Sequence, residues 1–371
     1  MTGCDIAIVG AGMAGASLAA EIAGDATVVL LEAESQPGYH STGRSAAFWS
    51  ETYGGPLVQP LTAASGAFLA APPPDFADGP FLGPRGAIHV AGEEGKPALA
   101  ALAREFAASD VTLQSIGRDR LEAMIPGLRA GWDFALVESS CTDIDVARLH
   151  AAYLKRARAR GARLLGDARV ERAEQVGGRW RIGTGAGTVE AGVLVNAAGA
   201  WADGLAAAAG VRPIGIQPYR RTIVQLRTEP GAPAELPLVI DALGRFYFKP
   251  EAGGRLWVSP HDETPCVAGD CAPEEIDIAV AIDRLQGIVD WRVERVERSW
   301  AGLRSFAPDR LPVYGFDPVQ PGFFWFAGQG GFGIQTAPAA AKLGAALLLG
   351  RDPDPMVAGI DPAPYAAGRF A

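Results

Sequence analysis

Three glycines near the start of the chain are spaced for binding a pyrophosphate. The motif Gly10-Ala-Gly-Met-Ala-Gly15 has glycine at positions 10, 12 and 15. Gly10 permits a tight turn, Gly12 lets backbone N–H groups approach a phosphate, and Gly15 lets a helix pack closely against a strand. Farther along, Glu32 is placed to accept hydrogen bonds from ribose hydroxyls. The spacing predicts a dinucleotide site.

The elements around this motif have the order that such a site requires. The apolar run Asp5–Val9 precedes it, the small-residue run Ala14–Ala23 is typical of a helix, and a second apolar run, Thr27–Leu31, ends at Glu32. The helix N-terminus would add a partial positive charge beside the phosphates. The alternative is a glycine-rich loop in an ordinary α/β protein, which does not explain Glu32.

Later segments supply further strands and two helices. Asp145 is typical of an N-cap for a helix over Val146–Arg160, on which we expect His150 to be solvated and inert. A second helix is predicted over Gln335–Leu349. Strands are predicted at Arg163–Leu165, Arg169–Ala173, Trp180–Thr184, Val193–Asn196, Arg221–Leu226, Phe246–Lys249, Leu256–Ser259 and Phe323–Ala327.

Nucleotide-binding signals at the start, middle and end of the chain predict a discontinuous cofactor domain. We assign residues 1–50, 145–211 and 301–371 to it, and residues 51–144 and 212–300 to a substrate domain. The length of 371 residues favours two closely packed domains.

Composition and charge exclude several classes of function. The net charge of -9 and the lack of Lys/Arg clusters argue against nucleic-acid binding. No apolar run reaches the roughly 18 residues of a membrane span, and no signal peptide fits before the first strand. The four cysteines are too scattered for a disulfide framework, and no metal spacing is present, so we expect free thiols and no metal site. A cytoplasmic enzyme is the resulting expectation.

Five motifs in order resemble the FAD-dependent D-amino-acid oxidase superfamily, which includes glycine oxidase and sarcosine oxidase. Within it, the chain is most similar to bacterial D-arginine dehydrogenase-like flavoenzymes. The motifs are Gly10–Gly15, Gln36–Ala47, Val195–Trp201, Trp300–Ser305 and Gly328–Gln335. The resemblance covers nearly the whole chain. It implies an α/β fold: a Rossmann-like FAD-binding domain of the GR2 type, with an α+β substrate domain on a mixed or antiparallel sheet.

The resemblance also implies which residues contact FAD. Three segments would lie along the cofactor from its adenine to its flavin: the first βα unit, the segment after the second strand and the C-terminal glycine turn. At the flavin, hydrogen-bond donors at a helix N-terminus favour reduction. The implied residues are Gly10, Gly12, Ala14, Gly15, Glu32, Ala33, Ser41, Thr42, Arg44, Ser45, Ala46, Val170, Ala198, Gly199, Trp201, Gly302, Gly330, Gly331, Phe332, Gly333, Ile334 and Gln335. For Arg44, a surface salt bridge is the alternative.

FAD is expected to be bound non-covalently. Sarcosine-oxidase-type members attach it through a cysteine in the C-terminal third, and no cysteine follows Cys271 here. Some distant relatives use a histidine near the position of His40, but the closer relatives carry that histidine without a bond.

Two arginines match the positions that hold the substrate carboxylate in the family. Arg221 and Arg304, helped by the hydroxyl of Tyr247, would grip a carboxylate and orient its Cα–H. The alternative is that they form structural ion pairs. Because strand side chains alternate, we expect the neighbouring Arg220 to face outward.

Other residues of the substrate site follow from the same resemblance. Tyr53, before Gly54 and Gly55, matches a tyrosine on a mobile lid, Gln335 matches a residue near the substrate amino group, and Ser50 is assigned to the same site. The close relatives have a histidine at Phe48 and an acidic residue at Ala87, which helps hold a cationic side chain.

The loss of both polar groups predicts a preference for neutral over cationic substrate side chains. Burying an unpaired cation costs several kcal/mol. Glu51 is the carboxylate that could restore a cation site by turning inward.

The implied reaction is oxidation of a D-amino acid to a 2-oxo acid and ammonia, as in amino-acid catabolism, by hydride transfer from Cα to flavin N5. None of His40, His89, His150 and His261 is assigned as a base. Alternatives are a flavin oxidase of secondary amines such as sarcosine or D-proline, a 2-hydroxy-acid dehydrogenase, and a non-catalytic flavoprotein subunit. The electron acceptor stays open between oxygen, a quinone and an artificial acceptor, and the oligomeric state is not predicted.

Overall fold

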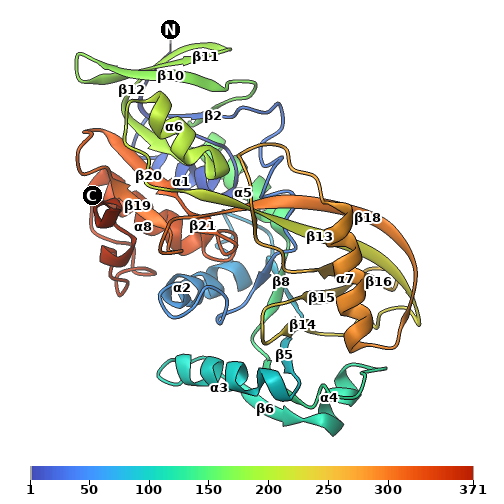
Figure 1. The fold of residues 1–371 in the computed structure, drawn as a ribbon. Coiled ribbons are helices and arrows are strands. Elements are labelled where there is room, and N and C mark those ends of the chain that lie inside the picture. The colour runs from blue at the N-terminus through green and yellow to red at the C-terminus, as the bar shows by residue number, and fades with distance from the viewer. Residues whose placement is uncertain (1, 371) are drawn as a thin grey trace.

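Two large β-sheets organise residues 2–370, which are the residues that the computed structural model describes (Figure 1). The first is a mixed sheet with the order β10-β11-β12-β1-β2-β9, in which β20 also pairs with β12 and with β19. β1 pairs in parallel with β2 on one side and with β12 on the other. Its strands are β1 (Thr2–Val9), β2 (Val28–Leu31), β9 (Arg163–Leu165), β10 (Val170–Val176), β11 (Arg179–Thr184), β12 (Gly187–Asn196), β19 (Val313–Phe316) and β20 (Phe323–Ala327).

Helices bury both faces of this first sheet. α1 (Met13–Ile22), α5 (Val146–Ala159) and α8 (Ala337–Leu349) share one core, while α6 (Ala202–Ala208) packs in the core on the opposite face. Alternate residues of β1 enter the two cores, Ile6 and Ile8 on one side and Ala7 and Val9 on the other. Because both faces are covered, the strand is a continuous apolar run.

The second sheet is larger and mostly antiparallel. Its order is β21-β18-β13-β16-β15-β14-β5-β7-β6, with β17 paired to β13, and α7 (Glu275–Ile288) packs on one face of it (Figure 1). Its strands are β5 (Ala87–Ala91), β6 (Gln114–Gly117), β7 (Phe134–Glu138), β13 (Gln217–Glu229), β14 (Leu238–Asp241), β15 (Tyr247–Glu251), β16 (Arg255–Ser259), β17 (Thr264–Pro265), β18 (Arg292–Phe306) and β21 (Gln329–Gly330).

Smaller elements complete the fold. A three-stranded sheet joins β3 (Phe48–Trp49), β8 (Thr142–Ile144) and β4 (Leu82–Pro84). The remaining helices are α2 (Gln59–Ala70), α3 (Lys96–Glu105) and α4 (Arg118–Met124), with 3-10 turns at Glu93–Gly95, Gly199–Trp201, Ala363–Tyr365 and Ala367–Phe370.

The packing divides the chain differently from the predicted domain boundaries at two places. α2 lies in the predicted substrate segment 51–144, yet Leu61, Phe68 and Leu69 pack in the core of the cofactor sheet beside α8. β18 runs unbroken across the predicted boundary at residue 300. Local sequence gave no sign of either, because both depend on contacts between distant segments. The end residues of the predicted division, 1 and 371, lie outside the described residues.

None of the helices described within residues 2–370 has the length and apolarity to cross a membrane. The four cysteines, Cys4, Cys141, Cys266 and Cys271, are free thiols. The predicted helix over Gln335–Leu349 begins at Ala337, with Pro338 in its first turn, where a missing N–H is tolerated.

Candidate active site

One elongated cavity of about 430 Å³ runs from the first βα turn to the junction of β13 and β18. All the predicted cofactor residues except Gly15, Phe332 and Gln335 line it. Arg221, Tyr247 and Arg304 line its other end. The first of these ends is called the dinucleotide end of the cavity, and the second is called its substrate end.

Glycine is required by geometry at the turn of the dinucleotide end. Gly10 has a φ of 100°, and a Cβ there would lie 2.4 Å from the carbonyl oxygen of Ala197. A Cβ on Gly15 would lie 1.9 Å from the carbonyl oxygen of Gly10. A Cβ on Gly12 would lie 3.3 Å from Thr42 Oγ1, which is a tight contact. The first and third glycines have no space for a Cβ and the second has little, so backbone alone faces the cavity at this turn, as close approach of a pyrophosphate requires.

Hydrogen bonds from two side chains on other elements, Glu32 and His150, fix the backbone of the same turn. Glu32 Oε2 accepts a hydrogen bond from the N–H of Ala11 at 2.8 Å, and its Oε1 accepts from the N–H of Glu34 at 3.1 Å. His150 Nε2 donates to the carbonyl oxygen of Ala11 at 2.8 Å. His150 is therefore buried, which corrects the prediction that it is solvated. Burial lowers the pKa of His150, so the ring is neutral at neutral pH.

The middle of the cavity ties the two sheets together. Ser41 Oγ donates to the carbonyl oxygen of Leu303 at 2.6 Å. The Arg44 guanidinium donates to the carbonyl oxygens of Cys271 and Ala301 at 3.1 and 3.2 Å and pairs with Asp270 at 2.5 Å. Arg44 lines the cavity, and it also forms the salt bridge that the sequence left open as its alternative role.

These residues fit FAD as the occupant of the dinucleotide end. The glycine turn presents backbone without side chains, Glu32 is held after β2 by the N–H of Ala11, and Val170 is in the same lining. Gly330, Gly331 and Gly333 bring backbone to the opposite side, ahead of α8. Phe332 packs away from the lining, against the rings of Tyr53 and Phe306.

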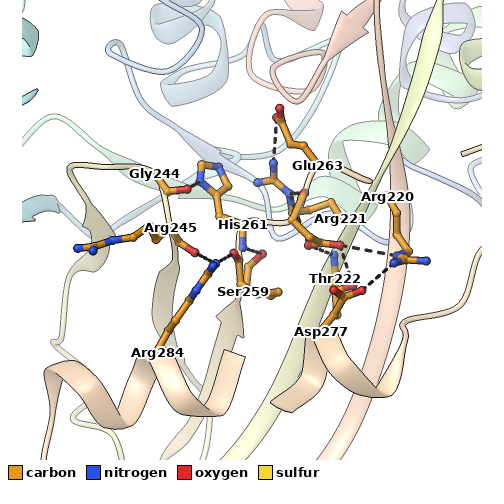
Figure 2. Close-up of polar contacts among 12 residues, drawn as sticks. Arg220, Arg221, Thr222, Gly244, Arg245, Ser259, His261, Glu263, Asp277 and Arg284 are labelled. Carbon is orange, nitrogen blue, oxygen red and sulfur yellow. Dashed lines mark hydrogen bonds and ion pairs between the residues drawn. The ribbon is translucent and has the colours of Figure 1, made fainter. Parts of the chain in front are cut away.

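Arg221 and Arg304 converge at the substrate end. In the antiparallel pair of β13 and β18, Arg221 lies opposite Gly302. Arg304 is two residues farther along β18, so both side chains share a face. Arg221 Nε donates to the carbonyl oxygen of Asp262 at 2.7 Å and Nη2 pairs with Glu263 at 3.1 Å, while Nη1 is buried without a partner (Figure 2). Arg304 makes no ion pair with any residue that the structure describes.

Arg220 lies on the opposite face of β13, as alternation predicts, but it is not exposed. Figure 2 shows the two neighbouring arginines directed to opposite sides of the strand. Arg220 is 8% exposed and pairs with Asp277 at 2.9 Å and with Glu274, both from the α7 region. The prediction of an outward side chain was wrong because α7 covers that face.

The charge of the two arginines shapes the substrate end. Burial, and then the neighbouring charge of Arg304, lower the pKa of Arg221 to about 10. Burial and the same two arginines lower the pKa of His261 to about 3. Its Nδ1 lies 2.6 Å from the carbonyl oxygen of Gly244, to which it donates as a neutral ring (Figure 2). Two buried cations with incomplete pairing form a site that an anion would stabilise.

Phe48, Tyr53 and Ala87 lie next to the substrate end, but only their neighbour Tyr247 is in the lining of the cavity. The Phe48 ring lies 5.8 Å from that of Tyr53 and 6.2 Å from that of Tyr247, centre to centre. Ala87 is fully buried in the same apolar cluster as Tyr247. Glu51 does not turn toward this cluster, because its carboxylate accepts hydrogen bonds from Ser140 at 3.2 Å and Gln59 at 3.4 Å.

Gln335 and Ser50 lie behind the cavity rather than in its lining. Gln335 is 2% exposed, and its Nε2 donates to the carbonyl oxygens of Ser50 and Tyr53 and to Thr62 Oγ1. Its Oε1 accepts from the N–H of Ser50 at 3.1 Å. The Ser50 hydroxyl donates to Glu138 at 3.0 Å. Both side chains hold the segment that carries Tyr53.

Two residues around the substrate end were not assigned a role from the sequence, and only the first of them, Glu138, carries a sequence signal. Glu138 closes the apolar run of β7, and a carboxylate next to a buried strand indicates a specific partner. His261 has a φ of 55°, which no local motif announces.

Comparisons with known proteins show the family and the fold of the chain. The sequence profile of the family described as FAD dependent oxidoreductase (DAO) matches residues 5–347. A glycine oxidase from Pseudomonas aeruginosa is 30% identical over 275 residues, which cover 70% of this chain and 69% of that protein.

Solved structures share the whole fold. Glycine oxidase from Geobacillus kaustophilus superposes with a TM-score of 0.85 at 24% identity, covering 99% of this chain and 98% of that one. L-proline dehydrogenase from P. horikoshii superposes with a TM-score of 0.82 at 20% identity, covering 96% of each chain.

Proposed function

The chain belongs to the FAD-dependent oxidoreductase (DAO) family, and we propose that it oxidises D-amino acids with neutral side chains to 2-oxo acids and ammonia. Members of this family bind FAD and oxidise amino acids or amines. The choice of D-amino acids and of neutral side chains is our proposal, and it rests on the substrate end of the cavity.

The observation that carries the proposal is the incomplete pairing of Arg221 and Arg304 on one face of the second sheet. Arg221 Nη1 is buried without a partner, although the rest of that guanidinium is bound by Glu263 and the backbone of Asp262. A substrate carboxylate supplies the missing acceptor, and a guanidinium binds a carboxylate through two parallel hydrogen bonds. Tyr247 lines the same cavity and offers a hydroxyl to that carboxylate.

The chain's own residues bind, orient and enclose the substrate. FAD bound along the dinucleotide end would supply the hydride acceptor for the Cα–H bond. The arginines fix the carboxylate and thereby the direction of the Cα–H bond, which removes most of the orientational entropy of the reaction. The aromatic rings of Phe48, Tyr53 and Tyr247 exclude water from the apolar side. The amine loses its proton to solvent, so no side-chain base is assigned.

The apolar cluster supports the preference for neutral side chains. Phe48 and Ala87 offer no acceptor to a cation, and the Glu51 carboxylate is bound by Ser140 and Gln59. A buried neutral side chain gains about 1.5–3 kcal/mol from burial. An unpaired buried ammonium or guanidinium would instead lose several kcal/mol.

Glycine is the second candidate substrate, because the P. aeruginosa relative that is 30% identical is named glycine oxidase. The same two arginines would bind its carboxylate. The secondary amines sarcosine and D-proline are related alternatives, since the carboxylate grip does not depend on substitution at nitrogen.

Turnover with an artificial electron acceptor tests the proposal. We expect D-leucine, D-methionine and D-phenylalanine to yield the corresponding 2-oxo acid and equimolar ammonia, with higher kcat/KM than glycine, sarcosine or L-leucine. Turnover confined to glycine and sarcosine would establish the second candidate. Turnover confined to 2-hydroxy acids, or none with any compound, would contradict the proposal.

A further inference from the structure

The segment Ser50–Tyr53 places an aromatic side chain against the two arginines. The Arg304 guanidinium lies 5.7 Å from the centre of the Tyr53 ring. A Cβ on Gly331 would lie 1.8 Å from the Tyr53 hydroxyl oxygen and 3.1 Å from Arg304 Cζ. The hydroxyl, the guanidinium and the backbone of Gly331 therefore meet at the substrate end, and small shifts of Tyr53 change the space left for a carboxylate.

A buried carboxylate holds the start of this segment. Glu138 Oε1 accepts from the N–H of Glu51 at 2.7 Å. Its Oε2 accepts from the hydroxyls of Thr52 at 2.6 Å and Ser50 at 3.0 Å, and lies 3.4 Å from His89 Nε2. Three consecutive residues of the segment thus donate to one side chain of the second sheet.

The Glu138 carboxylate has no exposure to solvent, and its charge depends on these donors. Burial alone would raise the pKa of Glu138, but the hydrogen bonds and charge of His89, the Thr52 hydroxyl and the Glu51 N–H outweigh it and hold the pKa below its ordinary value. An ionised carboxylate with several donors binds them more strongly than a neutral acceptor does.

The segment is fixed on its other side as well, and a glycine turn follows Tyr53. The Gln335 amide binds the backbone of Ser50 and Tyr53 from the cofactor sheet. Gly54 and Gly55 follow with φ of 102° and 78°, a conformation that few other residues adopt. Tyr53 therefore lies between the residues that Glu138 and Gln335 bind and a turn that requires glycine.

We propose that Glu138 is a positioning residue, which fixes Tyr53 over Arg304 through Ser50, Glu51 and Thr52 and so sets the affinity of the site for a substrate carboxylate. Glu138 does not act on the substrate itself. The effect on substrate affinity rests on the proposed function, whereas the clamp on the segment can be measured without any substrate.

The test compares holoprotein variants by hydrogen–deuterium exchange and by steady-state kinetics. Glu138→Gln and Thr52→Val remove parts of the clamp, while Thr52→Ser keeps the donor hydroxyl. Asp241→Asn is the matched control: Asp241 is a buried carboxylate of β14, the neighbour of β5, and binds Arg245 instead of the segment. Amide exchange is followed in the peptide covering residues 48–58, and KM and kcat are measured with D-leucine.

We expect faster exchange in that peptide for Glu138→Gln and Thr52→Val, with KM raised about tenfold or more and kcat changed much less, as loss of a charge-assisted hydrogen bond implies. Thr52→Ser and Asp241→Asn should resemble the wild type in both measurements. Unchanged exchange in the first two variants would overturn the proposal, as would faster exchange with unchanged KM. If the wild type oxidises no amino acid, the proposed function fails, and the exchange data still decide whether Glu138 clamps the segment.

Discussion

Backbone groups form the dinucleotide end of the cavity, whereas side chains form its substrate end. At the dinucleotide end, backbone from adjacent residues forms the site, and glycines with no room for a Cβ define it. At the substrate end, side chains from β13, β18, β15 and the Ser50–Tyr53 segment meet across large sequence separations. The first kind of site depends on local spacing, and the second depends on how two sheets and a loop pack.

This difference predicts different responses to mutation. At the dinucleotide end, adding a single methyl group should displace backbone and remove the cofactor. At the substrate end, the fold should survive the loss of a side chain while binding and turnover suffer. Variants of Gly15 and of the two arginines show whether damage stays at the end where it is introduced.

Gly15→Ala should cause the largest loss. Its Cβ would lie 1.9 Å from the backbone oxygen of Gly10, so the turn must move. We expect nearly all bound flavin, and with it all turnover, to disappear, as measured by absorbance of the purified protein. Gly24→Ala is the control, because the nearest atom to its Cβ would be Arg160 Cδ at 3.9 Å. A yellow, active Gly15→Ala protein would show that the turn is not the cofactor site.

Arg304→Ala should lower kcat/KM by a factor that corresponds to about 3–5 kcal/mol of lost transition-state stabilisation, the scale for breaking a buried charge pair. The variant should keep its flavin. Arg221→Ala should behave alike. Arg220→Ala is the matched control on the neighbouring position of the same strand: it breaks the ion pairs to Glu274 and Asp277 and should lower thermal stability, with KM near normal. Equal kinetic damage from Arg220→Ala and Arg221→Ala would refute the assignment of the carboxylate grip to one face.

Substrate side chains should be discriminated by a smaller amount. D-leucine should exceed D-arginine in kcat/KM by an amount equivalent to about 1.5–3 kcal/mol, since Phe48 and Ala87 lie in the apolar cluster of Tyr247 and offer no acceptor to a cation. Steady-state kinetics of the two substrates give the ratio. If D-arginine is better by tenfold, a cation partner must exist that the side chains around Phe48 do not reveal.

The partly buried His261 should make the protein less stable as the pH falls. Its folded-state pKa of about 3 lies below the ordinary value of 6.5, so below pH 6.5 the unfolded chain binds a proton that the folded chain does not. The unfolding free energy should therefore fall by up to about 1.4 kcal/mol per pH unit from this residue alone. Urea unfolding of the holoprotein at pH 7 and pH 5 should show a smaller loss for His261→Asn, because Asn tolerates φ of 55° and does not titrate. Equal losses in both proteins would contradict a neutral His261.

Acid precipitation of the protein shows whether the flavin is covalently bound, and this test concerns only the dinucleotide end. No cysteine follows Cys271, and His40 Nε2 is engaged with Glu34 at 3.0 Å. We therefore expect acid to release the flavin into the supernatant. Yellow colour that remains with the precipitated protein would show a covalent bond.

More of the dinucleotide end than of the substrate end could be predicted from the sequence. The order of strand, glycine turn, helix and strand, confirmed by α1 between β1 and β2, follows from local periodicity and spacing. The fold class and FAD followed from the resemblance and are confirmed by the family match and the shared fold. The pairing of Arg221 with Glu263 and the covering of Arg220 by α7 could not be predicted, because each needs the packed sheet.

Polar contacts between residues far apart in the chain were the features that the sequence could predict least. Ser50 and Gln335 are 285 positions apart, and Thr52 and Glu138 are 86 apart. Neither pair carries a spacing signal, since the residues meet only after both sheets have formed. His150 was misjudged for the same reason: its partner Ala11 lies 139 positions away.

Anaerobic mixing of the yellow holoprotein with matched amines tests the carboxylate grip most directly. D-leucine and 3-methylbutan-1-amine carry the same side chain and amine, and only D-leucine carries a carboxylate for Arg221 and Arg304. We predict that D-leucine bleaches the flavin absorbance rapidly in the wild type and slowly in Arg304→Ala, and that the amine leaves it unchanged in both. Bleaching by the amine at the rate of D-leucine would contradict the account.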